Sequence, residues 1–547
     1  MVQGDVMSLR NRLVLPVILS ALAVLAACGG SGTTTGTPPP TGGFTDANLN
    51  GTYVFSVTGS DAAGGLITIV GTFIANGSGG ISGGVIDTTG TTNGPAPGQA
   101  ITSGRYAVGP DGRPGSQNGV LTLMTSVQTY GFDFVLYSSE HGLMTEFDGN
   151  GSASGTLDLQ ANVTQANIDG QSYAFNLTGA SGVGTVLCLV QTPGGPIPLE
   201  TVGAFTLDNS GNMSAGVQDF NNNCSSAGDT GLALTGSVSL ATSPGRAALT
   251  ALGTTYNFDV FPVDATHLKF IETDAAPFLS GDVFTQTSSI PSPMVLSAGG
   301  YDHNAGLPFA FAGLLITDGN GNITTSSVED INEGGTATEV TAGITGTYAA
   351  VTGGRSVITF TGGFFNGNNG LACSGCQFAA YPSSGGVLLL EIDGAGLTDG
   401  SAFAQGNNPA LASAQGYGMN LSGSTSSSEE DDIAEFTNNS GTLGPGVIDF
   451  NDQGTTSFGK KYSATYAADT TVSGRGVVTP TTNAYNMVTY GIDSSTQVIV
   501  STDPSFVGVG FLAEQNASEK SNAAMSHLAV LRAHLAGRNA VKKPSGN

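Results

Sequence analysis

The amino-acid sequence predicts an all-β protein of four related domains in tandem, each with about eight antiparallel strands. The first observation is a signal that occurs four times: an Asp, a Gly seven residues later and a Gln five residues after that. The four sets are Asp148, Gly155 and Gln160; Asp274, Gly281 and Gln286; Asp393, Gly400 and Gln405; and Asp503, Gly510 and Gln515. They recur every 110 to 126 residues, which is the length of a domain. The second observation is that turn-forming clusters alternate with short β-branched and aromatic runs, in a chain where 83 of 547 residues are Gly.

Each repeat begins with an aromatic strand, at residues 53–55, 173–175 and 417–419 and in a divergent copy around Tyr301. A second strand leads into a polar turn. The turns start at Asn76, Asp208, Asp318 and Asn438. Because Asn, Asp and Gly accept positive φ angles, these segments are predicted to be tight hairpin turns. The strand after each turn ends at an acidic residue, which we call the closing Asp: Asp87, Asp219, Asp330 and Asp449.

The second half of each repeat contains a Gly-Arg pair, further strands and a Glu-x-Asp element. The Arg residues are Arg113, Arg246, Arg355 and Arg475. The Glu-x-Asp elements are Glu146 with Asp148, Glu272 with Asp274 and Glu391 with Asp393, and Ser501 replaces the Glu before Asp503. Eight sequential strands with short turns favour an antiparallel meander closed into a small up-and-down barrel, and a β-sandwich is the alternative. This layout resembles avidin-like and lipocalin-like barrels, although those families rely on Trp, which this chain lacks.

The first thirty residues indicate export. Arg10 and Arg12 precede an apolar run over 13–27, which is typical of a signal peptide and too short to span a membrane. The run ends in Leu25-Ala26-Ala27-Cys28, which resembles the lipobox of bacterial lipoprotein precursors and implies that Cys28 carries the lipid. The next residue is Gly29 rather than Asp, which by this resemblance favours the outer membrane. The expected address is therefore the bacterial envelope, at its periplasmic or surface-exposed face.

The predicted boundaries follow from these signals. We expect a signal peptide over 1–27, a lipid-bearing Cys with a Gly/Thr/Pro tether over 28–46, β repeats over 47–160, 165–286, 295–405 and 412–515, and a basic C-terminal helix or tail over 516–547. In that last segment Met525, Leu528, Leu531 and Leu535 recur at helical spacing. Such a helix could dock on the acidic fourth domain, lie on a membrane surface or be a frayed tail. Short linkers at 161–168, 287–297 and 406–413 predict separate domains on a semi-rigid string.

Composition excludes one class of partner and indicates disulfides. The net charge is −26, and only eight Lys or Arg residues lie between 44 and 515, so no nucleic-acid partner is expected. Apart from Cys28 there are four cysteines, and an even number in an exported protein predicts two disulfides. Cys188 and Cys224 fall in the second repeat, and Cys373 and Cys376 form a C-x-x-C in the third. A redox-active pair or half of a metal site are the alternatives for that C-x-x-C.

The repeated Arg residues account for half of those eight cations, so they require an explanation. The interpretation we favour pairs each Arg with the acid of Glu-x-Asp or with the closing Asp, which would hold strands together. The other places the Arg at a barrel mouth, where it binds a carboxylate or sulfate ligand. The turn at Asp318 also matches part of a calcium loop, but Ile323 stands where the sharp bend requires Gly. No metal or cofactor is therefore predicted.

The sequence offers little for catalysis. The five His residues show no metal-ligand spacing and are interpreted as scattered, never recurring at one position of the repeat. Pairs such as Glu146 and Asp148 could act on a glycan, but residues i and i+2 of a strand share one face in any barrel. We therefore expect a non-enzymatic, lipid-anchored surface protein for adhesion, envelope structure or partner binding. The alternatives are binding of a small ligand inside each barrel and, after that, a glycan-active enzyme. The partner, whether protein, glycan or small molecule, is not specified.

Overall fold

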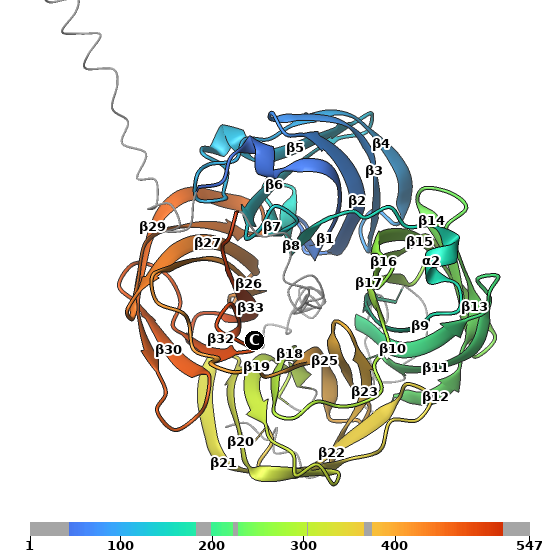
Figure 1. The fold of residues 1–547 in the computed structure, drawn as a ribbon, viewed down its shortest axis with the longest axis vertical. Coiled ribbons are helices and arrows are strands. Elements are labelled where there is room, and N and C mark those ends of the chain that lie inside the picture. Colours follow the sequence, from blue (N-terminus) through green and yellow to red (C-terminus); the bar gives the residue numbers. More distant parts are fainter. Residues whose placement is uncertain (1–42, 182–197, 223–227, 303–304, 366–374, 518–547) are drawn as a thin grey trace, which may run out of the picture. The chain divides into compact units, whose positions relative to one another are not determined.

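The structure is a computed structural model that describes residues 43–181, 198–222, 228–302, 305–365 and 375–517. All of these residues belong to one compact unit. They form 33 strands in four consecutive sheets, of which three are closed eight-stranded barrels and the second is a nine-stranded sheet. Figure 1 labels the strands along the chain, from β1 in blue to β33 in red. The prediction of an all-β chain with four up-and-down barrels is confirmed.

The first barrel contains β1 (Asn50–Asp61), β2 (Leu66–Asn76), β3 (Gly80–Gly90), β4 (Ala96–Arg105), β5 (Leu121–Thr125), β6 (Thr129–Leu136), β7 (His141–Glu146) and β8 (Gly151–Leu159). The second contains β9 (Ser172–Ala180), β10 (Pro198–Leu207), β11 (Met213–Asn221), β12 (Asp229–Ala233), β13 (Thr235–Ser239), β14 (Gly245–Ala251), β15 (Thr254–Asp264), β16 (His267–Glu272) and β17 (Phe278–Thr285). The extra strand arises because its fourth strand is interrupted at Leu234 into β12 and β13. The N–H of Leu234 still donates to the carbonyl of Gly216 on β11 at 3.1 Å, so this barrel is nearly closed.

The third barrel contains β18 (Met294–Asp302), β19 (Leu307–Leu315), β20 (Asn322–Glu333), β21 (Thr336–Tyr348), β22 (Ser356–Gly362), β23 (Cys376–Ser383), β24 (Gly386–Glu391) and β25 (Gly396–Ala404). The fourth contains β26 (Gln415–Ser424), β27 (Glu429–Asn439), β28 (Thr442–Asp452), β29 (Thr455–Ala468), β30 (Arg475–Pro480), β31 (Met487–Gly491), β32 (Thr496–Ser501) and β33 (Val507–Glu514). Three short helices complete the described part: η1 (Asp46–Asn48), η2 (Gln117–Gly119) and α2 (Gln165–Ile168).

Two of the repeated residues build each barrel. The repeated Gly lies on the last strand where that strand pairs with the first, as Gly155 does opposite Val57. A Cβ at Gly155 would overlap the carbonyl oxygen of Ser56, so only Gly allows the barrel to close this tightly. The repeated Asp fixes the turn before that strand: the Asp148 carboxylate accepts the N–H groups of Gly131 at 3.1 Å and Asn150 at 2.9 Å.

Apolar side chains fill the barrels. In the first barrel the inward residues of β1, β2 and β6 include Phe55, Phe73 and Phe132, all fully buried, with ring centroids 5.4 to 6.0 Å apart for the pairs that involve Phe55. The third barrel has an equally aromatic interior, where the rings of Phe360 and Phe364 stack with centroids 3.6 Å apart. Each barrel therefore has a hydrophobic core of its own.

Several predicted features lie outside the described residues. They are the signal peptide, Cys28 and the tether up to residue 42, together with Cys188, Cys224, Cys373 and the helix expected after residue 517. Within the described part of the chain, no helix is both long and apolar enough to cross a membrane.

Candidate functional site: the joints between barrels

Each barrel contacts the next one, and the fourth contacts the first. We name these contacts joints 1–2, 2–3, 3–4 and 4–1. Buried apolar clusters join neighbouring barrels at every joint within the described residues. Joint 1–2 has two clusters, one of Val54, Val70, Phe261, Val263 and Ile271 and one of Leu66, Ala180 and Phe278. The cluster at joint 2–3 contains Ala174, Val202, Ala204, Phe284, Ala379, Tyr381, Leu388, Leu390 and Ile392. The cluster at joint 3–4 contains Val295, Ala310, Ala312, Leu314, Val328, Phe403, Val488, Tyr490, Val498, Val500, Val507, Val509 and Phe511, and that at joint 4–1 contains Val135, Tyr137, Leu143, Ile433 and Ala513. The expectation of separate domains on a semi-rigid string is therefore wrong, because the outer faces of these strands are buried by the next barrel.

The side chain of the repeated Gln donates to the next barrel at joints 1–2, 3–4 and 4–1, whereas Gln286 donates to the carbonyl of Tyr173 in its own barrel at 2.9 Å. The Nε2 of Gln405 donates to the carbonyls of Ser473 at 3.1 Å and Gly491 at 3.0 Å, both in the fourth barrel. Gln515 does the same across joint 4–1, and Gln160 donates to Pro262 across joint 1–2. At all four joints the residue after this Gln also donates its N–H to the next barrel. The donor and acceptor pairs are Ala161 and Val263, Thr287 and Pro382, Gly406 and Ile492, and Asn516 and Tyr137.

The Gly of the Gly-Arg pair makes room for that Gln. Gly112, Gly354 and Gly474 have φ angles of +78°, +85° and +79°, in the left-handed region that favours Gly. A Cβ on them would lie 2.9, 2.5 and 2.8 Å from the Nε2 of the Gln of the preceding barrel. In the second repeat Gly245 meets no such Gln, because its Cβ would face Leu240 and Val260.

At two joints the repeated Arg forms a two-point ion pair with the closing Asp of the preceding barrel. At joint 3–4 Arg475 forms a two-point ion pair with Asp330, at 2.8 and 2.9 Å, and the Tyr490 hydroxyl donates to the same carboxylate at 2.6 Å. At joint 2–3 Arg355 binds Asp219 in the same way, at 2.7 and 2.8 Å. The neighbouring carboxylates hold the pKa of Arg475 and Arg355 above the usual value, because the charged guanidinium is stabilised.

The other two joints vary this arrangement. At joint 4–1 Arg113 pairs with Asp449 and lies 3.9 Å from Asp133, and the Arg side chain is buried. At joint 1–2 Arg246 is 59% exposed and pairs only with Asp259 of its own barrel. Burial raises the pKa of Asp87, the closing Asp there, and its hydrogen bond to Asp259 raises it further.

A third polar contact joins the residue two positions after the closing Asp to the turn of the next barrel. The Nδ2 of Asn451 donates to the carbonyls of Glu146 and Gly151 at 2.6 and 2.8 Å across joint 4–1. Asn221 and Asn332 make the equivalent contacts across joints 2–3 and 3–4. Thr89 stands at this position of joint 1–2 and its hydroxyl has no partner among the described residues.

Joint 1–2 has a buried charged cluster instead. The Nζ of Lys269 on β16 lies 3.0 Å from Asp282 and 3.4 Å from Asp158, which belongs to β8 of the first barrel. His141 and His267 lie 2.9 Å from Asp158 and Asp282, respectively. Although burial alone would raise it, the pKa of Asp158 is lowered to about 2 by Lys269 and His141. The two His residues start β7 and β16, which are equivalent strands, so the view that no His recurs in the repeat is wrong.

Buried acids without a cation gather on β27, at and near joint 4–1. Residues 429–432 are four consecutive acids and all are buried. Ser60 and Ser152 of the first barrel donate to Glu429 and Asp431, the latter at 2.6 Å. Burial raises the pKa of Glu435, on the same face of the strand, to about 9, and both of its carboxyl oxygens lack a partner among the described residues. A carboxyl with a pKa of about 9 stays protonated at neutral pH.

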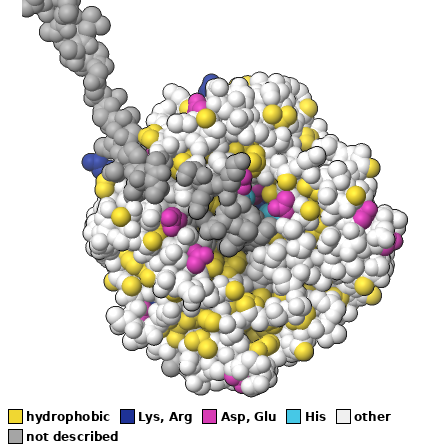
Figure 2. All heavy atoms as spheres, in the orientation of Figure 1, with side chains coloured by type: hydrophobic (Ala, Val, Ile, Leu, Met, Phe, Trp, Pro, Cys, Tyr) yellow, Lys and Arg dark blue, Asp and Glu magenta, His cyan; other side chains and the backbone are white. Residues whose placement is uncertain are grey.

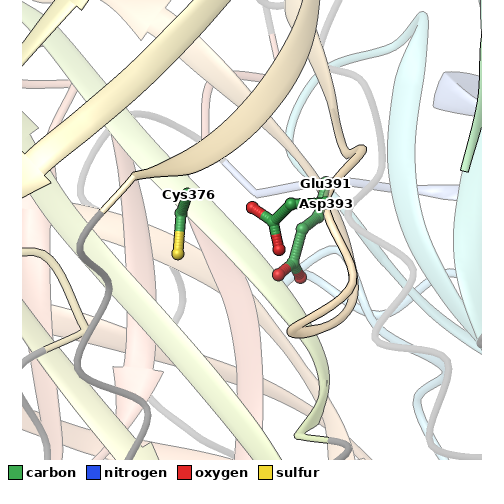
Figure 3. Close-up of side chains that lie close together, drawn as sticks. All are labelled: Cys376, Glu391 and Asp393. Atoms are coloured by element: carbon green, nitrogen blue, oxygen red, sulfur yellow. The ribbon is translucent and has the colours of Figure 1, made fainter. Parts of the chain in front are cut away.

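One group of possible metal ligands lies in the third barrel. A sulfur or oxygen atom of each of Cys376, Glu391 and Asp393 lies within 4.8 Å of the other two, and Figure 3 shows the two carboxylates side by side beside the sulfur. Cys376 already has a partner of its own, Thr398 donates to Glu391 at 2.5 Å, and Asp393 accepts the N–H of Gln377 at 2.6 Å. These contacts hold the three side chains in a structural turn, and burial raises the pKa of Glu391. Both observations favour a structural role for this group over a cation site.

The hairpin turns show how their oxygen-rich sequences are used. Asp318 accepts the N–H groups of Asn320 at 2.7 Å and Asn322 at 3.1 Å, and Asp208 accepts those of Ser210 and Asn212 in the same pattern. The pKa of both carboxylates is lowered, for Asp318 mainly by the side-chain amide of Asn322 and then by these backbone bonds, and for Asp208 mainly by the N–H of Asn212. The Asp side chain therefore fixes the turn by accepting hydrogen bonds from the backbone N–H groups that follow it.

Comparison with known proteins adds no family. No protein-family model matches the chain, and no curated protein matches it. Among solved structures, the P pilus usher (PapC) translocation pore is 9% identical over 86% of this chain and 99% of that chain, with a TM-score of 0.10. A TM-score this low carries no argument, so function has to be inferred from the residues.

Proposed function

We propose that this chain is an exported, lipid-anchored protein with a non-enzymatic surface role in adhesion, envelope structure or partner binding. The observation that carries the proposal is the use of the repeated charged residues. Arg113, Arg355 and Arg475 each bind the closing Asp of another barrel, so the charges that recur in the sequence are engaged in assembly. An Arg engaged in this way is not available to an anionic ligand, which favours the structural interpretation of these residues.

The barrel interiors support the same role. Their inward positions are occupied by packed aromatic and aliphatic side chains, and the buried members of these clusters are at most 9% exposed. Binding of a small ligand inside a barrel would require these side chains to move out of a packed core, which costs several kcal/mol per large residue. The interiors therefore give no support to that alternative.

The outer surface suits contact with an uncharged partner. On the face shown in Figure 2, Lys and Arg side chains are few, acidic groups are scattered, and most of the surface is neutral. The body would thus present polar hairpins on a rigid support. Because the four barrels share joints, a partner would meet a surface of fixed geometry rather than independent domains.

The anchor is tested by the substitution Cys28→Ser in a bacterial host supplied with an alkyne-bearing palmitate. We expect the lipid label to be lost and the chain to leave the membrane fraction, whereas the control Thr33→Ser keeps both. A Cys28→Ser chain that still carries the label would contradict the proposed anchor. We also expect the two proposed disulfides, Cys188 with Cys224 and Cys373 with Cys376, to appear as linked peptides after digestion without reductant.

The non-enzymatic role is tested by Glu391→Gln in cells whose attachment to a glass surface depends on this chain. Burial raises the pKa of Glu391, and Gln has nearly the same size and shape as Glu, so the substitution should perturb the fold little. We expect attachment to be unchanged by Glu391→Gln and reduced by Arg475→Ala, which breaks joint 3–4. Attachment lost with Glu391→Gln, in a chain that unfolds at the same urea concentration, would indicate carboxyl catalysis instead.

A further inference from the structure

Joint 4–1 has the same kinds of contact as joint 3–4 although no linker crosses it. The first barrel comes first in the chain and the fourth comes last. Even so, Gln515 donates to the carbonyls of Asp111 at 2.7 Å and Leu136 at 2.9 Å, as Gln405 does to its neighbour at joint 3–4. The specificity of a joint therefore resides in its surfaces and does not require a peptide connection.

The same holds for a body divided into two halves. We call residues 43–286, with the first two barrels, the first half, and residues 294–517 the second half. The halves meet at joints 2–3 and 4–1. At joint 2–3 the first half supplies the carboxylate of Asp219 and the second half supplies Arg355, whereas at joint 4–1 the first half supplies Arg113 and the second half Asp449. Each half thus presents one cationic and one anionic face, and each face has its complement on the other half.

Apolar contacts and amide contacts follow the same division. The buried cluster at joint 2–3 contains Ala174, Val202, Ala204 and Phe284 of the first half against Tyr381, Leu388 and Leu390 of the second. Asn221 of the first half donates to the turn at Glu391, and Asn451 of the second half donates to the turn at Glu146. The two faces are heterologous, so two halves can pair in one orientation only.

We propose that these faces are a docking surface for a second copy of this chain: the second half of one copy can take the place of the second half of another. Two chains that exchange halves satisfy every contact of joints 2–3 and 4–1 in each of the two bodies that result. The hinge would be the linker after Thr287, over 288–293, whose residues 288 and 289 are exposed. An exchange of this kind ties two chains together without any new surface.

The experiment uses residues 29–547 with a protease site inserted after Ser289. After cleavage of the folded chain, we expect both fragments to migrate as one body in native mass spectrometry. Mixing with the same cleaved chain grown in 15N medium should then yield bodies of intermediate mass. Asp219→Asn with Asp449→Asn should speed this exchange at least tenfold, because each joint loses the charge of its ion pair. Asp229→Asn, on an exposed part of β12, is the matched control and should leave the rate unchanged.

Two results would overturn the proposal. One is separation or unfolding of the fragments as soon as the linker is cut, while the uncut chain stays folded. The other is the absence of mixed bodies even after the two cleaved samples have been unfolded in urea and refolded together. Both readouts are independent of the lipid anchor and of cell attachment, so failure here leaves the proposed function standing.

Discussion

Replacement of Arg475 by Ala should destabilise the body far more than replacement of Arg246, although both residues stand at the same position of the repeat. The Arg475 side chain is 7% exposed and its partner Asp330 is 4% exposed. Arg475→Ala leaves that carboxylate buried with only the Tyr490 hydroxyl as a donor. Removal of one partner of a buried ion pair costs about 3 to 5 kcal/mol.

The Arg246 side chain is 59% exposed and makes its ion pair within one barrel. Its partner Asp259 is only 1% exposed, but water screens the exposed guanidinium, so this pair contributes less than a fully buried one, about 1 to 2 kcal/mol. The expected difference between the two variants is thus about 2 kcal/mol. It should appear as a clearly larger shift of the urea unfolding midpoint for Arg475→Ala than for Arg246→Ala.

A double substitution separates the charge from the packing. Asp330→Asn removes the buried charge that Arg475→Ala leaves behind, so the double variant should be more stable than the sum of the single losses predicts. The unfolding curve is measured by circular dichroism and by tyrosine fluorescence on the same samples. Equal losses for Arg475→Ala and Arg246→Ala, or strict additivity with Asp330→Asn, would refute the view that this ion pair holds joint 3–4.

Three further predictions concern the joints and their buried charges. Gly353→Ala and Gly354→Ala both place a side chain at positive φ, which costs about 1 kcal/mol. Only Gly354 faces a neighbouring barrel, where the Nε2 of Gln286 lies 2.5 Å from the new Cβ. The urea unfolding midpoint should therefore fall clearly further for Gly354→Ala, and equal shifts would contradict the role of this Gly. Lys269→Met should lower the stability by about 3 kcal/mol because it leaves two buried carboxylates without their cation, while the exposed control Lys460→Met should change the midpoint little. Glu435→Gln should leave the stability unchanged near pH 4 and raise it by about 3 kcal/mol at pH 7. The pKa of Glu435 in the folded state is about 9, above the ordinary 4.5, so the stability that this carboxyl contributes below pH 4.5 is lost as the pH rises toward 9. An unchanged dependence of the unfolding midpoint on pH would show that Glu435 is not protonated in the fold.

The barrel itself could be predicted from the sequence because its determinants are local. Turn residues such as those after Asn76 and Asp318 fix the hairpins, and the alternation of apolar and polar residues fixes which face of a strand points inward. The repetition of these signals in four copies gave the domain count. The number of strands followed from the length of each repeat, and the short turns between sequential strands favoured closure into a barrel over the alternative β-sandwich.

The joints could not be predicted, because their partners are far apart in the chain. Arg113 pairs with Asp449, 336 residues later, and one sequence contains nothing that connects the two positions. A signal was present in strands with apolar residues on both faces, such as residues 134–136 in β6, since a barrel strand facing water would alternate. That pattern shows that an outer face is covered. It does not show by which barrel.

The departure of joint 1–2 from the common pattern indicates what a joint requires. This joint has an exposed Arg246, a Thr89 in place of Asn and a Gly245 that receives no Gln, yet Gln160 and the apolar cluster around Phe261 remain. The buried Lys269 ties Asp158 of the first barrel to the second. The constant elements are therefore the apolar contact, a backbone bond from the end of one barrel to the next, and one largely buried cation facing an acid of the neighbouring barrel. Different residues supply that cation, so a joint requires charge complementarity between barrels rather than an Arg at one fixed position.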